Sequence, residues 1–324
     1  MNCEDIFKTY AVELKKTEER LAEIFKSNVF LLPMIGRHIA GSGGKRLRPL
    51  FLLLSAGICG YKGDKKNLLA AIIEAIHTAS LLHDDVIDGA DTRRGKPAAN
   101  ALWGNQVVIL VGDFLYSNAL KLAVLQKNQK IMEALSEATT KMTEGEILQL
   151  SKIGDPDITT DEYYEIISAK TGVLISAACK IGAILGGANS KKEAALAAYG
   201  MKIGIAFQLA DDILDYVAQQ KNLGKKLGKD LEEGKITMPM IRLLKNASKS
   251  EVQEIKSIIK EQKKGAKKLQ RIIELFEKYN AIGESLCIAQ ALVDEAKKEL
   301  RAFPSSKQKR DLLLMADYAM QRQH

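Results

Sequence analysis

The spacing of apolar residues is the feature that most limits what this chain can fold into. Apolar positions recur three and four residues apart along almost the whole sequence, and no alternating run of strand length with hairpin residues interrupts them. The composition agrees, because only 6% of residues are aromatic and only six are proline. We therefore expect an all-α chain with helices at 4–26, 28–40, 46–60, 66–91, 99–126, 129–151, 160–186, 191–219, 237–246, 249–263, 265–301 and 306–322.

Loop-forming stretches separate these helices but mark no domain boundary. "GSGGKRLRP" (41–49), "QQKNLGKKLGKDLEEGK" (219–235) and "FPSSK" (303–307) are typical of loops. Thr159 and Glu162 have the spacing of a capping box, which predicts a helix start there. Because the composition does not shift and no linker is long enough to separate folding units, we expect a single domain over residues 1–324.

The same pattern bears on the cellular compartment. No segment reads as the roughly 20 apolar residues that span a bilayer, and the most apolar run, 49–60, predicts a buried helix. The N-terminal residues carry early acids and lack the apolar core of a signal peptide. The four cysteines are isolated, which favours reduced thiols in a cytoplasmic protein; they are Cys3, Cys59, Cys179 and Cys287.

The net charge of +8 calls for an anionic partner or a solvated basic face. Much of the surplus lies in "KSIIKEQKKGAKKLQR" (256–271), where bases fall between Ile258, Ile259 and Leu269. A solvated helix face is the favoured interpretation, and a weak attraction to an anionic membrane surface is the alternative. Nucleic acid is the weakest candidate partner, because the bases discussed below lie beside acids that repel phosphate.

An acidic cluster follows an apolar helix at "LLHDDVIDGADTRRG" (81–95). Asp84, Asp85 and Asp88 are spaced i, i+1, i+4, so their carboxylates converge on one side of a helix. An exposed acidic face is the ordinary alternative, but the segment upstream is apolar and heads into a core. Hard oxygen ligands with this spacing suit Mg²⁺.

The pattern occurs a second time at "FQLADDILDY" (207–216), as Asp211, Asp212 and Asp215. Six of the 17 aspartates lie in these two motifs, so chance is a poor explanation. We expect the two helices to face each other and to form a six-carboxylate rim that holds several Mg²⁺ ions and, through them, substrate phosphates.

Basic residues near both clusters complete a diphosphate site. Arginine forks fit diphosphate oxygens, ammonium groups act on them as point charges, and a Gly-rich backbone approaches an anion closely. Each base alone is more often a surface charge, but together with paired acidic motifs they predict phosphate binding. The candidates are Lys45, Arg46, Arg48, Arg93, Arg94, Lys170, Lys225 and Lys235.

These motifs closely resemble those of the trans-isoprenyl diphosphate synthases, and within them the long-chain, octaprenyl-type branch. "GGKRLRP", "LLHDDVIDGADTRRG", "GEILQL", "AKTG", "FQLADDILDY" and "LGKKLGKDLEEGKITMP" occur in the family's order between residues 43 and 239. The resemblance implies an all-α bundle around a deep central cavity, a homodimer, and a Mg²⁺-dependent prenyltransferase. Such an enzyme adds isopentenyl diphosphate repeatedly to an allylic diphosphate, such as farnesyl or geranyl diphosphate, for isoprenoid quinone biosynthesis.

The resemblance also implies roles for individual residues. The magnesium ligands would be Asp84, Asp85, Asp88, Asp211 and Asp215, with Asp212 on the same rim. Arg93, Lys170, Thr171, Gln208 and Lys225 would hold the allylic diphosphate. Lys45, Arg48, His77 and Arg94 would hold isopentenyl diphosphate, and Lys235 would lie near a closing loop at 220–235.

Several positions suit the chemistry of an allylic cation. Gly172 within a helical stretch can loosen the backbone hydrogen-bond ladder and free a carbonyl near Lys170 and Thr171. Gln208 or Phe207 could line the same spot, with ordinary helix packing as the alternative. The chain offers no obvious general base, so released diphosphate is the expected proton acceptor.

Product length should depend on residues below the first cluster. Ala79 and Ser80 are small where a Phe or Tyr would close the cavity, and Ile76 continues the wall of the same helix. On the helix expected at 129–151, Met132 and Leu135 are candidates for the cavity floor, and core packing is nearly as good an explanation. A terpene cyclase, a head-to-head synthase and a non-catalytic subunit of a heteromeric synthase are the competing functions.

Overall fold

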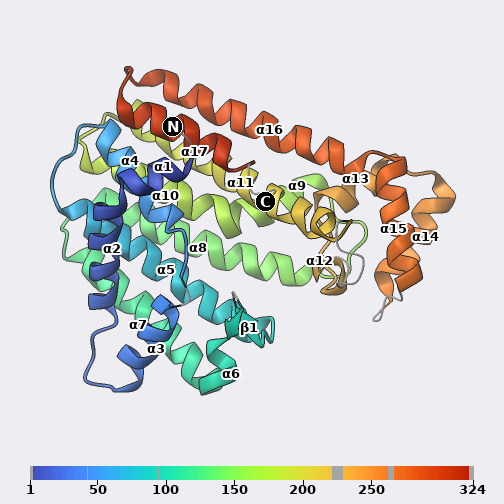
Figure 1. Ribbon diagram of the computed structural model, residues 1–324, viewed down its shortest axis with the longest axis horizontal. Helices are drawn as coiled ribbons and strands as arrows, with labels where there is room; N and C mark the ends of the chain where they lie inside the picture. The colour runs from blue at the N-terminus through green and yellow to red at the C-terminus, as the bar shows by residue number, and fades with distance from the viewer. Residues whose placement is uncertain (1–2, 42, 94, 221–228, 262–265, 321–324) are drawn as a thin grey trace. The chain divides into compact units, whose positions relative to one another are not determined.

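The computed structural model describes residues 3–41, 43–93, 95–220, 229–261 and 266–320 and is built almost entirely of helices (Figure 1). The N-terminal helices are α1 (Cys3–Thr9), α2 (Ala11–Ile24), α3 (Leu31–Gly41), α4 (Leu47–Ile58), α5 (Lys65–Ile87), α6 (Ala99–Trp103), α7 (Asn105–Val124) and α8 (Gln129–Ser151). The later ones are α9 (Thr160–Ile167), the π-helix η1 (Ser168–Gly172), α10 (Val173–Leu185), α11 (Ser190–Gln220), α12 (Lys229–Glu232), α13 (Met238–Asn246), α14 (Lys249–Lys260), α15 (Ala266–Lys278), α16 (Ala281–Glu299), the 3₁₀ helix η2 (Leu300–Ala302) and α17 (Lys307–Tyr318).

Backbone contacts divide the chain into two compact units, each assembled from separate segments. Unit 1 comprises Met1–Thr139, Ala177–Ala197 and Ala302–Leu312. Unit 2 comprises Thr140–Ser176, Ala198–Arg301 and Leu313–His324. The expectation of one domain stays a prediction.

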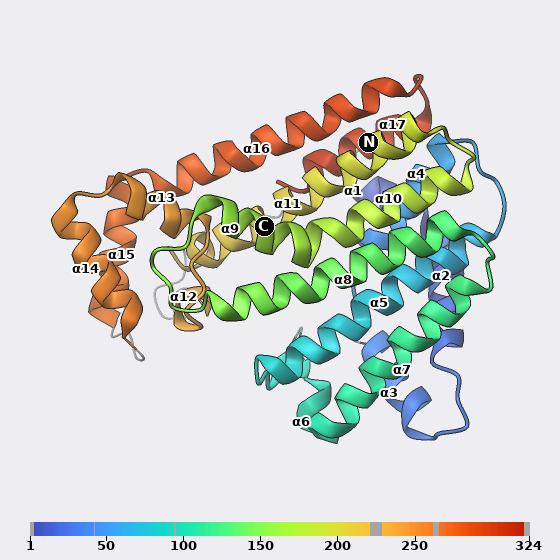
Figure 2. The same cartoon turned by 180° about the vertical axis from the view of Figure 1, so that it is seen from behind.

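Unit 1 is organised around α5. This helix packs against α2, α4 and α7 (Figure 2). Its residues Ile72, Ile73 and Ile76 are fully buried. The apolar run that the sequence assigned to a buried helix is α4, whose residues 49–56 are all buried. The removal of this apolar surface from water stabilises the frame that presents the C-terminal end of α5.

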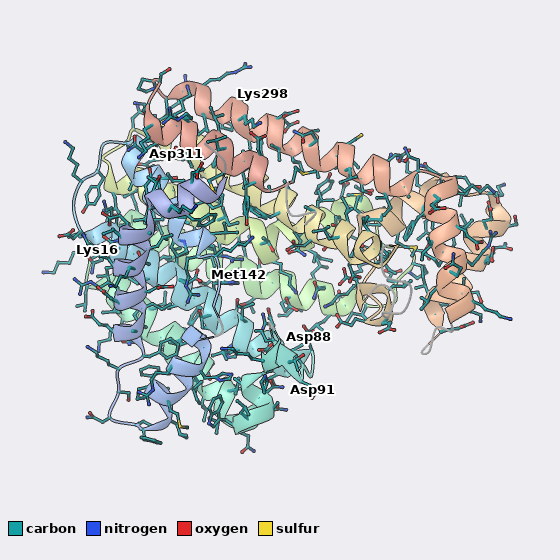
Figure 3. All side chains as sticks on the ribbon, in the orientation of Figure 1. Lys16, Asp88, Asp91, Met142, Lys298 and Asp311 are labelled. Atoms are coloured by element: carbon teal, nitrogen blue, oxygen red, sulfur yellow. The ribbon has the colours of Figure 1, made fainter. Side chains whose placement is uncertain are left out.

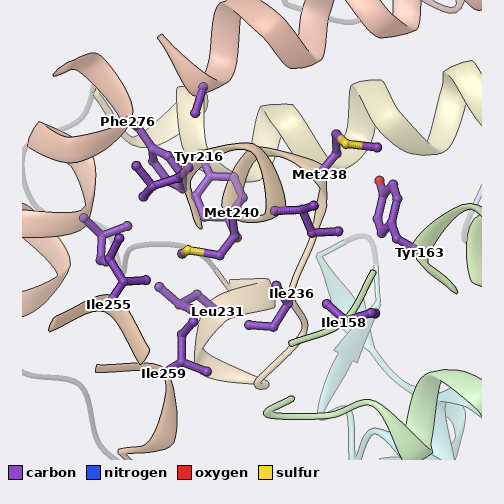
Figure 4. Close-up of a cluster of buried hydrophobic side chains, with 14 of the residues drawn as sticks. Ile158, Tyr163, Tyr216, Leu231, Ile236, Met238, Met240, Ile255, Ile259 and Phe276 are labelled. Carbon is purple, nitrogen blue, oxygen red and sulfur yellow. The ribbon is translucent and has the colours of Figure 1, made fainter. Parts of the chain in front are cut away.

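Unit 2 has its own apolar core, in which α13 packs against α9, α15 and α16. Figure 4 shows this cluster, with Tyr216, Met240 and Phe276 in its interior and Tyr163 at one edge. Tyr216 and Phe276 meet edge to face with their ring centroids 4.9 Å apart. The cluster therefore supports the C-terminal half of α11 and the position of Tyr163.

Three predicted helices are interrupted in the structure. The segment 4–26 breaks at Tyr10, 99–126 breaks at Gly104, and 265–301 breaks at Asn280. Gly104 and Asn280 have positive φ values of 79° and 48°, which a continuing helix does not contain. The sequence analysis also did not foresee a short antiparallel pair, β1 (Thr92–Arg93) with β2 (Lys96–Pro97), or α12.

Local signals were read correctly at two places. The capping box of α9 forms as predicted, because the Thr159 hydroxyl accepts from the Glu162 amide and the Glu162 carboxylate accepts from the Thr159 amide. The segment 160–186 was expected to be a helix that Gly172 loosens. A π-helical turn over Ser168–Gly172 confirms that the ladder widens there.

The expectation that no segment is apolar enough to cross a membrane was wrong. By length and composition, Asn105–Val124 and Thr160–Leu185 both qualify. In the apolar window of Thr160–Leu185, 72% of the residues are buried inside the structure, as in the core helix of a soluble protein, whereas 33% of the window in Asn105–Val124 is buried. The two segments were not predicted from the sequence because isolated polar residues interrupt their apolar runs.

The basic region at 256–271 carries ion pairs on its described residues. Lys268 pairs with Glu261, and Arg271 lies 3.0 Å from a carboxylate oxygen of Glu254. Ile258 and Ile259 are buried beneath them. These contacts favour the solvated helix face over the membrane alternative.

Candidate active site

The first acidic cluster lies where α5 ends. The helix stops at Ile87, and Gly89 takes up the left-handed conformation (φ 59°) that commonly closes a helix. The amide of Asp88 donates to the carbonyl of Asp84 at 2.8 Å. Figure 3 shows the side chain of Asp88 at this helix end, where it is exposed, while Asp84 is half-buried.

Asn100 of α6 fixes this helix end. Its side-chain amide donates to the carbonyls of Asp85 (3.2 Å) and Ala90 (3.0 Å). The Asp85 carbonyl also accepts the Ala90 amide at 2.9 Å, so Asn100 braces the turn that follows the helix. The sequence analysis missed Asn100, because nothing in the spacing of a lone asparagine indicates which carbonyls it will reach.

The middle carboxylate of the first cluster is held by Arg93. The Arg93 Nε lies 2.7 Å from Oδ1 and 2.9 Å from Oδ2 of Asp85, and Nη2 lies 2.7 Å from Oδ1. The Asp85 side chain is only 3% exposed. A carboxylate buried to this degree needs a counter-ion, and the planar guanidinium supplies one with directed hydrogen bonds.

A cavity in unit 1 collects several of the predicted substrate residues. His77, Asp85 and Arg93 line it together with His38 and Glu74, which the sequence analysis did not single out. The His38 Nε2 lies 3.1 Å from the carbonyl oxygen of Pro97, and the His38 ring meets Trp103 edge to face. The cavity thus joins α3 and α5 to the segment around β2.

Arg46 points into the helix layer. Its guanidinium lies 3.1 Å from Glu74 on α5 and 3.2 Å from Glu18 on α2, and its side chain is 11% exposed. Arg46 has a left-handed backbone (φ 50°) at the start of α4. Lys45 is exposed and Arg48 is half-buried in the first turn of α4, and neither lines the cavity. Arg94 lies outside the described residues.

The second acidic cluster lies on α11 in unit 2, beside the π-helical turn. A Cβ added at Gly204 would come within 2.5 Å of the Gly172 Cα and 3.1 Å of the Thr171 carbonyl oxygen. Only glycine permits so close an approach. This contact brings Thr171 next to Gln208, which lies one helical turn after Gly204.

A hydrogen-bond chain runs from Thr171 to a buried tyrosine. The Thr171 Oγ1 donates to Gln208 Oε1 at 2.7 Å, and the Gln208 Nε2 donates to Asp212 Oδ1 at 2.8 Å. The Tyr163 hydroxyl donates to Asp212 Oδ2 at 2.5 Å. Tyr163 is 3% and Asp212 is 5% exposed, so this network is shielded from water. The sequence analysis did not single out Tyr163.

Burial shifts the acidity of these groups. Burial raises the pKa of Asp212 to about 7, and the charge of Asp230 adds to the effect, while the bonds from Tyr163 and Gln208 oppose it. The pKa of Asp230 rises to about 6 through burial and the charge of Asp215. Burial and the Asp212 charge raise the pKa of Tyr163 well above its ordinary value, so Tyr163 remains a donor.

Lys170 is held between polar groups of α8. Its Nζ lies 3.3 Å from Glu146 Oε2 and 3.3 Å from Gln149 Oε1. A Cβ added at Gly145 would lie 2.3 Å from that of Ala169, so the close packing at this glycine brings α8 and η1 together. Three residues of the motif "GEILQL" therefore surround Lys170: Glu146 and Gln149 contact its ammonium, and Gly145 packs against the neighbouring Ala169.

A cavity of about 150 Å³ in unit 2 gathers four of the remaining candidates, Lys170, Gln208, Asp212 and Lys235. Its polar lining residues are Gln149, Lys152, Tyr163, Lys170, Gln208, Asp212, Asp230, Lys235 and Thr237. The Lys235 Nζ lies 2.7 Å from Glu233, and Asp215 accepts the Asp230 amide at 3.0 Å. Asp211 is exposed. Lys225 and the other residues of 221–228, which are half of the loop expected to close at 220–235, lie outside the described residues.

This chain is similar to known proteins in sequence and in structure. The model of the polyprenyl synthetase family matches residues 31–276. The chain belongs to the polyprenyl synthetase family. It is 38% identical to the octaprenyl diphosphate synthase of Escherichia coli (strain K12) over 322 residues, which are 99% of each protein.

Two further similarities span the chain. The short chain isoprenyl diphosphate synthase of Methanothermobacter thermautotrophicus is 38% identical over 332 residues and is covered completely. The crystal structure of a polyprenyl synthase from Caulobacter crescentus CB15, complexed with calcium and isoprenyl diphosphate, is 36% identical with a TM-score of 0.92. That match covers 100% of this chain and 98% of the other.

These findings confirm the predicted family, the all-α fold and the enzyme class. As a member of the polyprenyl synthetase family, the chain is a trans-prenyl diphosphate synthase, a prenyltransferase of isoprenoid biosynthesis. The motif order recognised in the sequence was therefore a reliable indicator, since each motif is weak alone and their combination is specific.

In this polyprenyl synthetase, the predicted chain-length residues lie on α5 and α8. Ile76 and Ala79 are each 1% exposed, and the Ser80 hydroxyl donates to the His77 carbonyl at 2.9 Å. Leu135 is fully buried and Met132 is half-buried. Their roles in setting product length stay predictions.

The carboxylates of this synthase fit a hard divalent ion by chemistry, although they are not pre-assembled. Over the described part of the chain, no three His, Cys, Asp or Glu side chains gather closely enough to hold an ion. Asp85 and Asp212 are engaged by protein donors, whereas Asp88 and Asp211 are exposed. Carboxylate oxygens at helix surfaces are the ligands that Mg²⁺ prefers. A shared six-carboxylate rim stays a prediction.

Proposed function

We propose that this enzyme adds isopentenyl diphosphate repeatedly to an allylic diphosphate, of the farnesyl or geranyl type, in a Mg²⁺-dependent reaction. The product would be a long-chain all-trans polyprenyl diphosphate, octaprenyl-like, for isoprenoid quinone biosynthesis in the cytoplasm. The observation that carries the proposal is the hydrogen-bonded chain from Thr171 through Gln208 to Asp212, in a chain of this family. Gln208 and Asp212 line one cavity together with Lys170.

Each set of residues has a distinct task in this proposal. Asp84, Asp85, Asp88, Asp211 and Asp215, with Asp212 beside them, form the acidic clusters that attract the ions. When bound, Mg²⁺ would neutralise charge on the leaving diphosphate, and the Caulobacter crescentus relative was crystallised with calcium and isoprenyl diphosphate. Allylic diphosphate would be bound by Arg93, Lys170 and Lys225. Isopentenyl diphosphate would be bound by Lys45, Arg48, His77 and Arg94. Lys235 lines the cavity of unit 2 that Lys170 also lines.

Bond breaking at the allylic carbon requires charge stabilisation on both sides. Negative charge grows on the diphosphate, and the Lys170 ammonium, which is held by Glu146 and Gln149, would offset it. Positive charge grows on the hydrocarbon. The oxygens of Thr171 and Gln208, fixed beside the π-helical turn, are the dipoles that would face this charge.

The length of the product would depend on small side chains on α5. Ala79 is buried and Ser80 is half-buried, and a larger residue at either position would block an extended chain. Sequence identity does not decide the length, because the octaprenyl and the short chain relatives are both 38% identical. The small residue at position 79 therefore supports the longer product.

We also propose that the enzyme is a homodimer whose contact includes α7. Leu110 and Val124 on this helix are 66% and 56% exposed, and Ile109 is 41% exposed. Apolar side chains this exposed on one helix are typical of a protein contact. Leu110→Glu should yield monomers by light scattering, with Lys121→Glu on the same helix as the control. A weak membrane-surface association would serve the release of a hydrophobic product.

The test of this function is direct. Purified chain is incubated with Mg²⁺, isopentenyl diphosphate and farnesyl diphosphate, and the dephosphorylated products are sized by chromatography. The proposal expects a ladder of long products from the chain alone. An absence of isopentenyl incorporation would refute catalysis by this chain alone, and products of only one or two added units would refute the long-chain assignment.

A further inference from the structure

We propose that Tyr163 and Asp212 are positioning residues, which together fix the direction of the Gln208 side-chain amide and so keep its carbonyl oxygen toward Thr171. This inference rests on the proposed function, because it gives that oxygen a task only if an allylic substrate reacts beside it. Neither residue needs to contact the substrate for this role.

The direction of each hydrogen bond follows from what the groups can donate. Gln208 Nε2 lies 2.8 Å from Asp212 Oδ1 and donates to it, so the NH₂ end of the amide faces Asp212. The opposite end, the carbonyl oxygen, then faces Thr171, whose hydroxyl donates to it at 2.7 Å. A reversed amide would place oxygen against oxygen at Asp212.

Tyr163 restricts the rotation of the Asp212 carboxylate. Its hydroxyl donates to Asp212 Oδ2 at 2.5 Å, so the two carboxylate oxygens receive donors from two different helices, α9 and α11. The Tyr163 ring is 3% exposed and lies at the edge of the apolar cluster with Ile236 and Met238 (Figure 4). Because packing restricts the ring and the hydroxyl together, the carboxylate cannot rotate without losing both bonds.

This arrangement separates Asp212 from its neighbours in the acidic cluster. Asp212 is buried, whereas Asp211 is exposed and Asp215 is half-buried. Each oxygen of Asp212 accepts a hydrogen bond from a side chain, one from Tyr163 and one from Gln208. An isosteric Asp212→Asn change should therefore alter the Gln208 orientation more than the affinity for divalent ions. The introduced asparagine would accept from Tyr163 and present its NH₂ to Gln208, which would then turn its own NH₂ toward Thr171.

The experiment compares kcat with the Mg²⁺ concentration for half-maximal activity. We expect Asp212→Asn to lower kcat by about 30-fold and Tyr163→Phe by about tenfold, while half-activation by Mg²⁺ stays within about twofold. Asp211→Asn is the matched control and should raise the Mg²⁺ requirement. A Tyr163→Phe/Asp212→Asn double variant should be no slower than Asp212→Asn, because both act through one chain of bonds.

A reciprocal exchange gives the sharpest outcome. In Asp212→Asn/Gln208→Glu, the NH₂ of the introduced asparagine can donate to one oxygen of the introduced glutamate while Thr171 donates to the other, so the chain is restored. We expect this double variant to be faster than either single variant. Thermal unfolding supplies a readout without turnover, in which the effects of Tyr163→Phe and Asp212→Asn on the free energy should be non-additive.

Two results would overturn the inference. The first is an Asp212→Asn enzyme with an unchanged kcat. The second is an Asp212→Asn enzyme whose Mg²⁺ requirement is raised as much as that of Asp211→Asn, together with an Asp212→Asn/Gln208→Glu enzyme that is no faster than either single variant. Loss of isopentenyl incorporation in the wild-type chain would instead refute the proposed function. The wild-type assay, run first, tells these failures apart.

Discussion

Arg93, which is half-buried, forms an ion pair with the buried Asp85, in which one guanidinium nitrogen lies 2.7 and 2.9 Å from the two carboxylate oxygens. The pair joins β1 to the last turn of α5, eight residues earlier in the chain. It explains why charge changes sign so abruptly in this segment. The acid that faces inward, Asp85, is paired with the arginine that follows it, whereas Asp88 of the same cluster is exposed.

Arg93→Lys should weaken this connection. A lysine keeps the charge but cannot make the paired hydrogen bonds, so we expect the KM for allylic diphosphate to rise by about tenfold and the free energy of unfolding to fall by about 1–2 kcal/mol. Steady-state kinetics and chemical unfolding measure both. Arg20→Lys, in the exposed pair with Glu23, is the control and should change neither. Equal effects of the two substitutions would contradict the assigned role.

The Arg46–Glu74 pair should hold the loop that we propose binds isopentenyl diphosphate. Arg46→Met leaves the Glu74 carboxylate, whose side chain is 8% exposed, without this partner, which costs about 3 kcal/mol of unfolding free energy. We expect a raised KM for isopentenyl diphosphate, since Lys45 and Arg48 flank Arg46 in the loop. Glu18→Gln tests the exposed partner and should cost less than about 1 kcal/mol. An unchanged KM in Arg46→Met would limit the pair to a structural role.

Ala79→Tyr should shorten the product. The side chain at this position is 1% exposed, so a tyrosine would project into space that an extended hydrocarbon needs, at about 1–3 kcal/mol of overpacking. Chromatography of the dephosphorylated products should show short chains at an undiminished rate of the first condensation. Ala79→Ser, which adds one atom, should leave product length unchanged. A tyrosine variant that still made long chains would contradict the cavity account.

The pH dependence of stability should report on Glu251, far in the sequence from both acidic clusters. Bonds from Lys278, Ser248 and Tyr279 lower the pKa of this carboxyl to about 2. Its contribution is therefore present above its ordinary pKa of about 4.5 and is lost as the pH falls toward 2. Glu251→Gln should lower the melting temperature at pH 7 and have little effect near pH 2. Glu144→Gln, at an exposed pair with Lys141, is the control.

Much of the fold was predictable because its signals are local. Apolar periodicity located most helices, the capping box at Thr159 was read correctly, and Gly172 indicated the widened turn. The breaks at Tyr10 and Asn280 were not predicted, since the periodic pattern runs across them and tertiary packing decides them. The correct family followed from the order of several motifs rather than from any one of them.

The supporting residues of the site were not predictable for a different reason. Tyr163 and Asp212 are 49 positions apart, and Arg46 and Glu74 are 28 positions apart. No spacing rule indicates that such residues become partners, because only the folded helices bring them together. The sequence therefore indicated Asp212 and Arg46 as single candidates but not their partners, and it missed Tyr163 and Asn100.

The most direct test of the central claim is the incorporation of labelled isopentenyl diphosphate by the purified chain as Mg²⁺ is titrated back after chelation. The account predicts no polyprenyl product in excess chelator, recovery on adding Mg²⁺, and a higher Mg²⁺ requirement in Asp84→Asn and Asp211→Asn. Turnover that continues in excess chelator would contradict it, and so would the same Mg²⁺ requirement in both variants as in the unaltered chain.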